Sequence, residues 1–163
     1  MPNTTLTIEQ VLSLLAATPS RIASLTANLA PEQLQTSPDP EQWSANDVLA
    51  HLRACADVWG TCIAEILEHD HPTLRAVNPR TWIRKTNYRE QAFEPSLQAF
   101  SEQRAKLLAT LKPLAPEDWS RAATVTGAGN VLERTVLFYA RWLAGHERPH
   151  LGQIERIASI IHK

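Results

Sequence analysis

Apolar residues along this chain recur every three to four positions over long stretches, which is the spacing that gathers them on one face of an α-helix. The first such stretch begins at Ile8 and repeats through Leu29. Pro19 lies inside it and either kinks that helix or begins its second half. The pattern predicts four helices, over residues 7 to about 35, 44 to about 69, 95 to 111 and 131 to 161.

The second predicted helix has the best-defined start. Ser44 and Asp47 have the spacing of a capping box, and Trp43 and Val48 have the spacing of a hydrophobic staple. The Ser-Pro-Asp-Pro segment at residues 37–40 cannot continue a helix and is predicted to be a linker. The sequence therefore predicts a sharp boundary between the first two helices.

The connection from residue 71 to about 93 is longer than most loops in compact domains. It carries the large aromatic residues Trp82 and Tyr88 among the basic residues Arg80, Arg84, Lys85 and Arg89. We interpret it as a packed cover over one end of the helices, and the alternative is an ordinary surface loop. A second connection, before the fourth helix, holds Trp119 and a flexible segment at residues 126–130.

Composition favours a single all-α domain over residues 1–163, because the chain has only five glycines and its helical stretches dominate. We predict a four-helix bundle. The formal net charge of −1 argues against a general nucleic-acid binder. The apolar runs are far shorter than the roughly 20 residues of a membrane span. The first ten residues do not resemble a secretory signal, so we expect a cytoplasmic protein.

Histidines interrupt two of the predicted inward helix faces. The face of the second helix consists of Val48, His51, Cys55, Val58, Cys62 and Ile66. The face of the fourth helix consists of Tyr139, Trp142, Leu143, His146, His150, Gln153, Ile154, Ile157 and Ile161. Because a buried imidazole needs a hydrogen-bond partner, water or a metal ion, these positions are candidates for a functional site.

Metal binding suits this arrangement. His146 and His150 lie one helical turn apart and can supply two nitrogens to one ion, and His51 can supply a third from the facing helix. Three protein ligands leave a position open for water or substrate, as in catalytic zinc sites. Gln153 is then a candidate for orienting a ligand or the substrate. The alternative is that the histidines are core residues with ordinary partners.

Two further readings of the same residues stay open. Residues 146–150 match the His-Glu-x-x-His pattern of metalloproteases, although Pro149 disturbs the helix and no third protease-type ligand follows. Glu147 is nevertheless a candidate base acting on metal-bound water. Cys55, one turn after His51, could close a structural three-His, one-Cys site, but we prefer to interpret it as a small buried hydrophobe.

Three segments resemble the DinB-like superfamily of metalloenzymes, and the resemblance covers nearly the whole chain. They are residues 41–52 (Glu-Gln-Trp-Ser-Ala-Asn-Asp-Val-Leu-Ala-His-Leu), residues 114–119 (Leu-Ala-Pro-Glu-Asp-Trp) and the terminal His146-x-x-x-His150-x-x-Gln153-Ile154 pattern. The resemblance implies an up-down-down-up bundle. It also implies a divalent ion, commonly zinc or nickel, bound by the residues at positions 51, 146 and 150.

The resemblance further implies an activity. Similar proteins are often thiol-dependent enzymes in which the metal lowers the pKa of a low-molecular-weight thiol. We therefore expect a thiol S-transferase or a hydrolase that acts on a small electrophilic molecule, with His51, His146 and His150 as metal ligands and Glu147 or Gln153 assisting. A homodimer is also expected. The alternatives are a non-catalytic, stress-related bundle with a structural metal and a metal-free dimerisation module.

Overall fold

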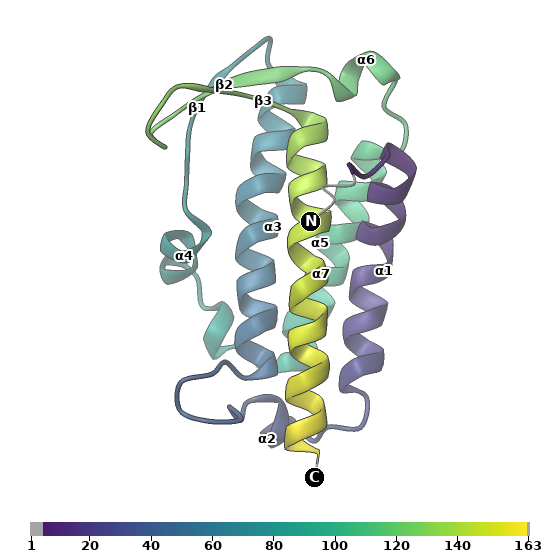
Figure 1. The fold of residues 1–163 in the computed structure, drawn as a ribbon, viewed down its shortest axis with the longest axis vertical. Coiled ribbons are helices and arrows are strands. Elements are labelled where there is room, and N and C mark those ends of the chain that lie inside the picture. Colours follow the sequence, from purple (N-terminus) through teal and green to yellow (C-terminus); the bar gives the residue numbers. More distant parts are fainter. Residues whose placement is uncertain (1–4, 163) are drawn as a thin grey trace.

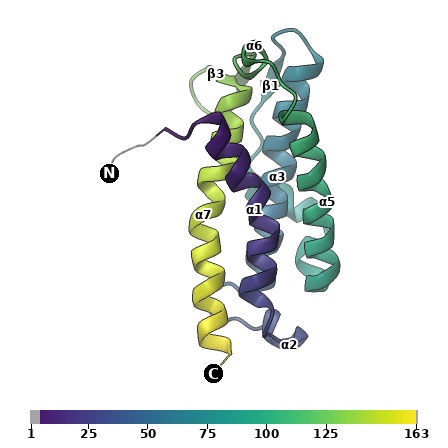
Figure 2. The same cartoon turned by 90° about the vertical axis from the view of Figure 1, so that its right-hand side faces the viewer.

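Four long helices form the body of the protein in the computed structural model, which describes residues 5–162. They are α1 (Ile8–Thr26), α3 (Ala45–Glu68), α5 (Phe93–Leu111) and α7 (Val136–Ile161). Helices α1 and α7 run in one direction, and α3 and α5 run in the other (Figure 1 and Figure 2). The predicted bundle of four helices is confirmed. No helix within the described residues offers a stretch that is apolar enough to cross a membrane.

Side chains of the preceding residues cap three of these helices. Thr7 and Gln10 form a capping box at the start of α1. Ser44 and Asp47 form the predicted one at the start of α3. The hydroxyl of Thr135 accepts a hydrogen bond from the Phe138 amide at the start of α7. Each cap satisfies backbone donors that have no partner within the helix, so these starts are fixed by local sequence.

The first helix ends earlier than the apolar pattern predicts. It stops at Thr26, and a separate short helix, α2 (Pro31–Leu34), follows. Pro31 prevents a continuous helix through residue 30, because the proline ring disfavours a helical conformation at the residue before it. Ala30 is accordingly extended, with φ −72° and ψ 159°. The predicted continuation to about residue 35 is therefore wrong.

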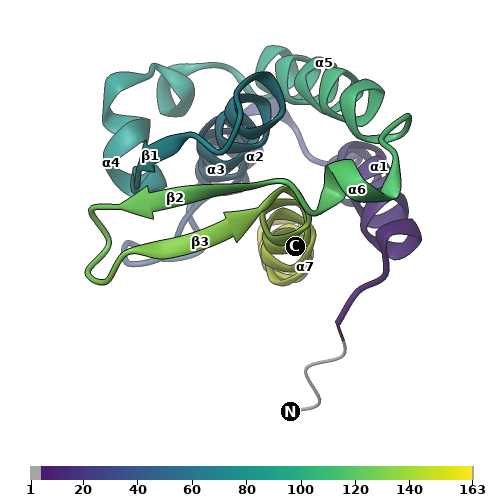
Figure 3. The same ribbon diagram turned by 90° about the horizontal axis from the view of Figure 1, so that it is seen from above.

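A small sheet covers one end of the bundle and departs from the all-α prediction (Figure 3). Strand β1 (Thr73–Arg75) pairs in parallel with β2 (Ala122–Thr126), and β2 pairs antiparallel with β3 (Leu132–Thr135). Gly127 and Gly129 have φ of 87° and 86°, which glycine adopts without strain, and they turn the β2–β3 hairpin. The fourth helix therefore begins at Val136, and its predicted start at residue 131 is wrong.

The long connection between α3 and α5 is packed, as predicted, and it contains short helical turns. These are α4 (Pro79–Trp82), a 3₁₀ turn at Ile83–Lys85 and a second at Tyr88–Glu90. Since α3 and α5 are parallel, the chain must return along the length of the bundle between them. It does so beside α3 rather than over one end of the helices (Figure 1). We call residues 76–92 the cover segment.

Asp57 on α3 holds the cover segment in place. Its carboxylate accepts hydrogen bonds from the Trp82 indole (3.0 Å), the Tyr88 hydroxyl (2.5 Å) and the Gln103 amide (2.6 Å). The guanidinium of Arg53 lies 3.8 Å from the centre of the Tyr88 ring and donates to Gln91 and Ser96. Arg53 therefore joins α3 to the cover segment and to α5.

We expect Asp57→Ala to lower the free energy of unfolding by about 2–3 kcal/mol, because it leaves three half-buried donors without their charged acceptor. Urea denaturation measures the loss, and limited proteolysis reports cleavage within the cover segment. Asp70→Ala is the matched control, since Asp70 is exposed after α3. A variant as stable and as protease-resistant as the control would contradict the assigned role of Asp57.

Candidate metal centre

Two neighbouring helices carry the candidate metal centre. His51 lies in the second turn of α3, Cys55 one turn later, and His146 and His150 lie on α7. Cys55 and His51 are buried, and His146 and His150 are half-buried. Because α7 stays helical through Pro149, the two α7 histidines project from one side of it.

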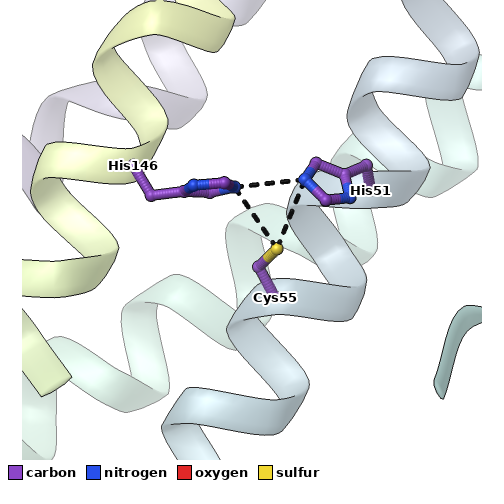
Figure 4. A group of neighbouring side chains, drawn as sticks. All are labelled: His51, Cys55 and His146. Carbon is purple, nitrogen blue, oxygen red and sulfur yellow. Dashed lines mark hydrogen bonds between the residues drawn. The ribbon is translucent and has the colours of Figure 1, made fainter. Parts of the chain in front are cut away.

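Three side-chain atoms converge between these helices (Figure 4). The Nε2 atoms of His51 and His146 are 3.1 Å apart. The Sγ atom of Cys55 lies 3.6 Å from the first and 3.5 Å from the second. The structure therefore brings together His51 and His146, two of the three predicted metal ligands. It also places Cys55 beside them, although we had interpreted Cys55 as a small buried hydrophobe.

This donor set fits a zinc-like ion. With metal bonds of about 2.05 Å to nitrogen and about 2.3 Å to sulfur, tetrahedral angles separate two nitrogens by about 3.3 Å and a nitrogen and a sulfur by about 3.6 Å. The three observed separations lie close to these values. Imidazole and thiolate are also ligand types that zinc prefers.

Burial sets the protonation of these groups. It is the main cause that lowers the pKa of His51 and of His146 to about 4, helped in both cases by the His150 imidazole and by Arg80. Both rings are therefore neutral near pH 7, which is the form that binds metal. Burial raises the pKa of the Cys55 thiol to about 12, and Glu147 adds to the effect. Cys55 is therefore protonated near pH 7 unless a cation stabilises the thiolate.

His150 lies beside this group of atoms. Its ring centre is 4.9 Å from that of His51 and 4.7 Å from that of His146. Its Nδ1 is 2.8 Å from the Gln153 side-chain oxygen. A ring that donates from Nδ1 presents Nε2 as an acceptor, and such a partner fixes the orientation of a metal-binding histidine. Gln153 thus contacts His150 in the way expected of a residue that orients a ligand.

Glu147 occupies a different environment from the one that a general base needs. Its carboxylate is buried and forms a bidentate ion pair with Arg104 of α5. Oε1 also accepts a hydrogen bond from the Thr18 hydroxyl of α1 at 2.9 Å. The three helices α1, α5 and α7 are joined by this group. Both oxygens are engaged, so the geometry favours a structural role for Glu147.

Aromatic rings flank the histidines on both sides. Trp43 lies 5.2 Å from His51, and Trp59 lies 5.2 Å from His146, measured between ring centres. Trp59 also contacts Trp142, which was predicted to face inward but is 49% exposed. The tryptophans at 43 and 59 were not predicted to be part of the site.

Two cavities open beside the histidines, and sequence reasoning had missed both. One, of about 180 Å³, is lined by Trp43, His51, Arg80, Ile83, Arg84 and Arg89. A larger one of about 590 Å³ includes His150 and Gln153 and shares Trp43 and Arg80 with the first. The basic residues of the cover segment were visible in the sequence, but their position beside His51 depends on the path of the chain.

Other predicted residues have mostly structural surroundings. Tyr139 is buried, as predicted, and burial raises its pKa. Arg141 donates a hydrogen bond from Nε to the Leu6 carbonyl oxygen. His69 and His71 are exposed, and His71 contacts Glu133 and Thr124. Cys62 is a free thiol, as is Cys55.

Comparisons with known proteins identify a family and a fold for this chain. The sequence matches the DinB superfamily over residues 14–154. Among solved structures, YfiT from Bacillus subtilis superposes with a TM-score of 0.75 at 18% identity, covering 98% of this chain and 91% of that one. YfiT is described as "a probable metal-dependent hydrolase with an unusual four-helix bundle topology". No curated protein matches the sequence at a significant level.

Proposed function

Since the chain belongs to the DinB superfamily, we propose that it is a divalent-metal-dependent enzyme that acts on a small electrophilic molecule. The reaction is a hydrolysis or the transfer of a low-molecular-weight thiol. Zinc and nickel are the metals that we expect. The observation that carries the proposal is the convergence of the His51 and His146 nitrogens, 3.1 Å apart, beside an open cavity.

In this proposal His51, His146 and His150 hold the metal. A divalent ion with an open coordination position lowers the pKa of a water or thiol bound to it, which supplies the nucleophile. The side-chain oxygen of Gln153 accepts a hydrogen bond from Nδ1 of His150 and keeps that ring oriented. Trp43 and Trp59 exclude water from two sides of the imidazoles. Glu147 and Arg104 fix α7 relative to α5 and thereby position its two histidines.

The test is elemental analysis of the protein purified without chelator, followed by assays on metal-loaded and chelated samples. We expect about one divalent metal per chain, and removal of it should lower both the melting temperature and the rate of ester hydrolysis or thiol transfer. A chain that holds no metal, and whose melting temperature does not respond to zinc, nickel or manganese, would refute the proposal.

A second candidate function rests on Cys55. Its Sγ lies within 3.6 Å of both converging nitrogens, which favours a closed site with three histidines and one cysteine. Such a site stabilises the bundle and has no open position for substrate. Absorption spectra of the cobalt-substituted protein distinguish the two: a thiolate-to-metal band with four protein ligands supports the structural site, and solvent in the fourth position supports the enzyme. The homodimer and the cytoplasmic location stay predictions.

A further inference from the structure

Three arginines of the cover segment gather at the small cavity that reaches His51. Arg80, Arg84 and Arg89 line it together with Trp43 and Ile83. The same cavity is lined by His51, so the three arginines lie beside the candidate metal centre. The whole chain has a formal net charge of −1, so this concentration of positive charge is local.

The guanidinium groups are free to bind a ligand. Within residues 5–162, none of the three side chains forms an ion pair or donates a hydrogen bond to another side chain or to the backbone. Their contacts are with an aromatic face: Arg80 lies 5.5 Å and Arg89 lies 5.8 Å from the centre of the Trp43 ring. Cation–π contacts at these distances do not engage the N–H groups of either guanidinium, which stay available to a ligand.

Two sets of contacts with α3 anchor the backbone that carries these arginines. Asn46, buried in the first turn of α3, donates from Nδ2 to the carbonyl oxygens of Arg89 (3.3 Å) and Gln91 (3.0 Å). Trp82, between Arg80 and Arg84, is bound to Asp57. The three side chains are exposed, and a fixed backbone reduces the entropy that is lost when they bind a ligand.

We infer that the substrate of the proposed enzyme is a small organic anion, whose carboxylate or phosphate group is bound by Arg80, Arg84 and Arg89 while its reactive part lies at His51. The planar N–H pair of a guanidinium matches the two oxygens of either group. The placement of the reactive part of the substrate at His51 rests on the proposed function. The anion site itself needs only the arginines.

Binding of simple probes to the protein, with and without added zinc, tests this, measured by titration calorimetry in a buffer without phosphate. Succinate and inorganic phosphate serve as anionic probes, and succinamide serves as the neutral probe with the same carbon skeleton as succinate. We expect saturable binding of at least one anion and none of succinamide. Arg84→Gln and Arg89→Gln should each raise its Kd by about tenfold, because each removes a charge-assisted hydrogen-bond donor.

Arg75→Gln is the matched control, since Arg75 is an exposed arginine at the end of β1 and packs beside Gly127. Binding of succinamide as tight as that of succinate, or an equal loss in Arg75→Gln, would overturn the inference. Metal content is measured on the same samples. Full metal content without anion binding refutes the anion site alone, whereas anion binding by a wild-type chain that takes up no metal refutes the proposed function alone.

Discussion

Arg104→Met is expected to lower the free energy of unfolding by about 3–5 kcal/mol, the largest single loss that we predict for this chain. The variant leaves the Glu147 carboxylate buried without its cation. It also removes the donor to the Leu15 carbonyl, which Arg104 contacts at 2.8 Å. Because the ion pair joins α1, α5 and α7, we expect the whole bundle to lose stability together. The midpoint of a single urea unfolding transition should therefore move to a lower urea concentration.

A double variant separates the ion pair from the packing around it. Arg104→Met combined with Glu147→Leu removes both charges, and we expect it to recover most of the stability that Arg104→Met alone loses. Lys106→Met controls for the loss of a positive charge on α5, because Lys106 is exposed. If the single variant loses no more than this control, the pair does not hold α1, α5 and α7 together.

His51→Ala and His146→Ala should each weaken zinc binding by more than about 100-fold, because replacing even a residue that only orients a ligand costs about 10- to 100-fold. His150→Ala should show a comparable loss, because the proposal makes its ring the third ligand. Gln153→Ala should show the smaller loss of an orienting residue. Competition against a chromophoric chelator gives the affinities. Circular dichroism verifies that each variant is folded.

His69→Ala is the control, since His69 is an exposed histidine at the end of the same helix as His51. Cys55→Ala belongs to the same series. A loss as large as that of His51→Ala indicates a closed site with a thiolate ligand, and a loss of less than about tenfold indicates an open one. If all three histidine variants bind zinc as tightly as the wild type, these histidines do not form a metal site.

Much of the helical frame could be predicted from the sequence because its causes are local. The Ser44–Asp47 capping box is read directly from residues three apart, and the structure contains it. The His51 and His146 positions could be predicted because each interrupts an apolar face of known periodicity. The Nε2 atoms of the two rings lie 3.1 Å apart because α3 and α7 are neighbours in the bundle.

Features that depend on contacts between distant parts of the chain could not be predicted from the sequence. Strand β1 has three residues and exists because it pairs with β2, about 50 positions later. Glu147 sits next to His146 in sequence and was expected to act at the metal, yet its partner Arg104 lies on another helix. The anchoring contacts of Asp57 with Trp82 and Tyr88 likewise join residues with no sequence periodicity in common.

Because α3 and α5 are parallel, the chain between them forms a separate segment, and metal binding and anion binding are assigned to different parts of the protein. The candidate metal ligands lie on the buried helices α3 and α7. The arginines lie on the cover segment, whose position depends on its contacts with Asn46 and Asp57. Exposed residues of that segment can therefore be exchanged without altering the bundle. Grafting a different set of side chains onto residues 76–92 is thus a direct route to redesigning what this scaffold selects.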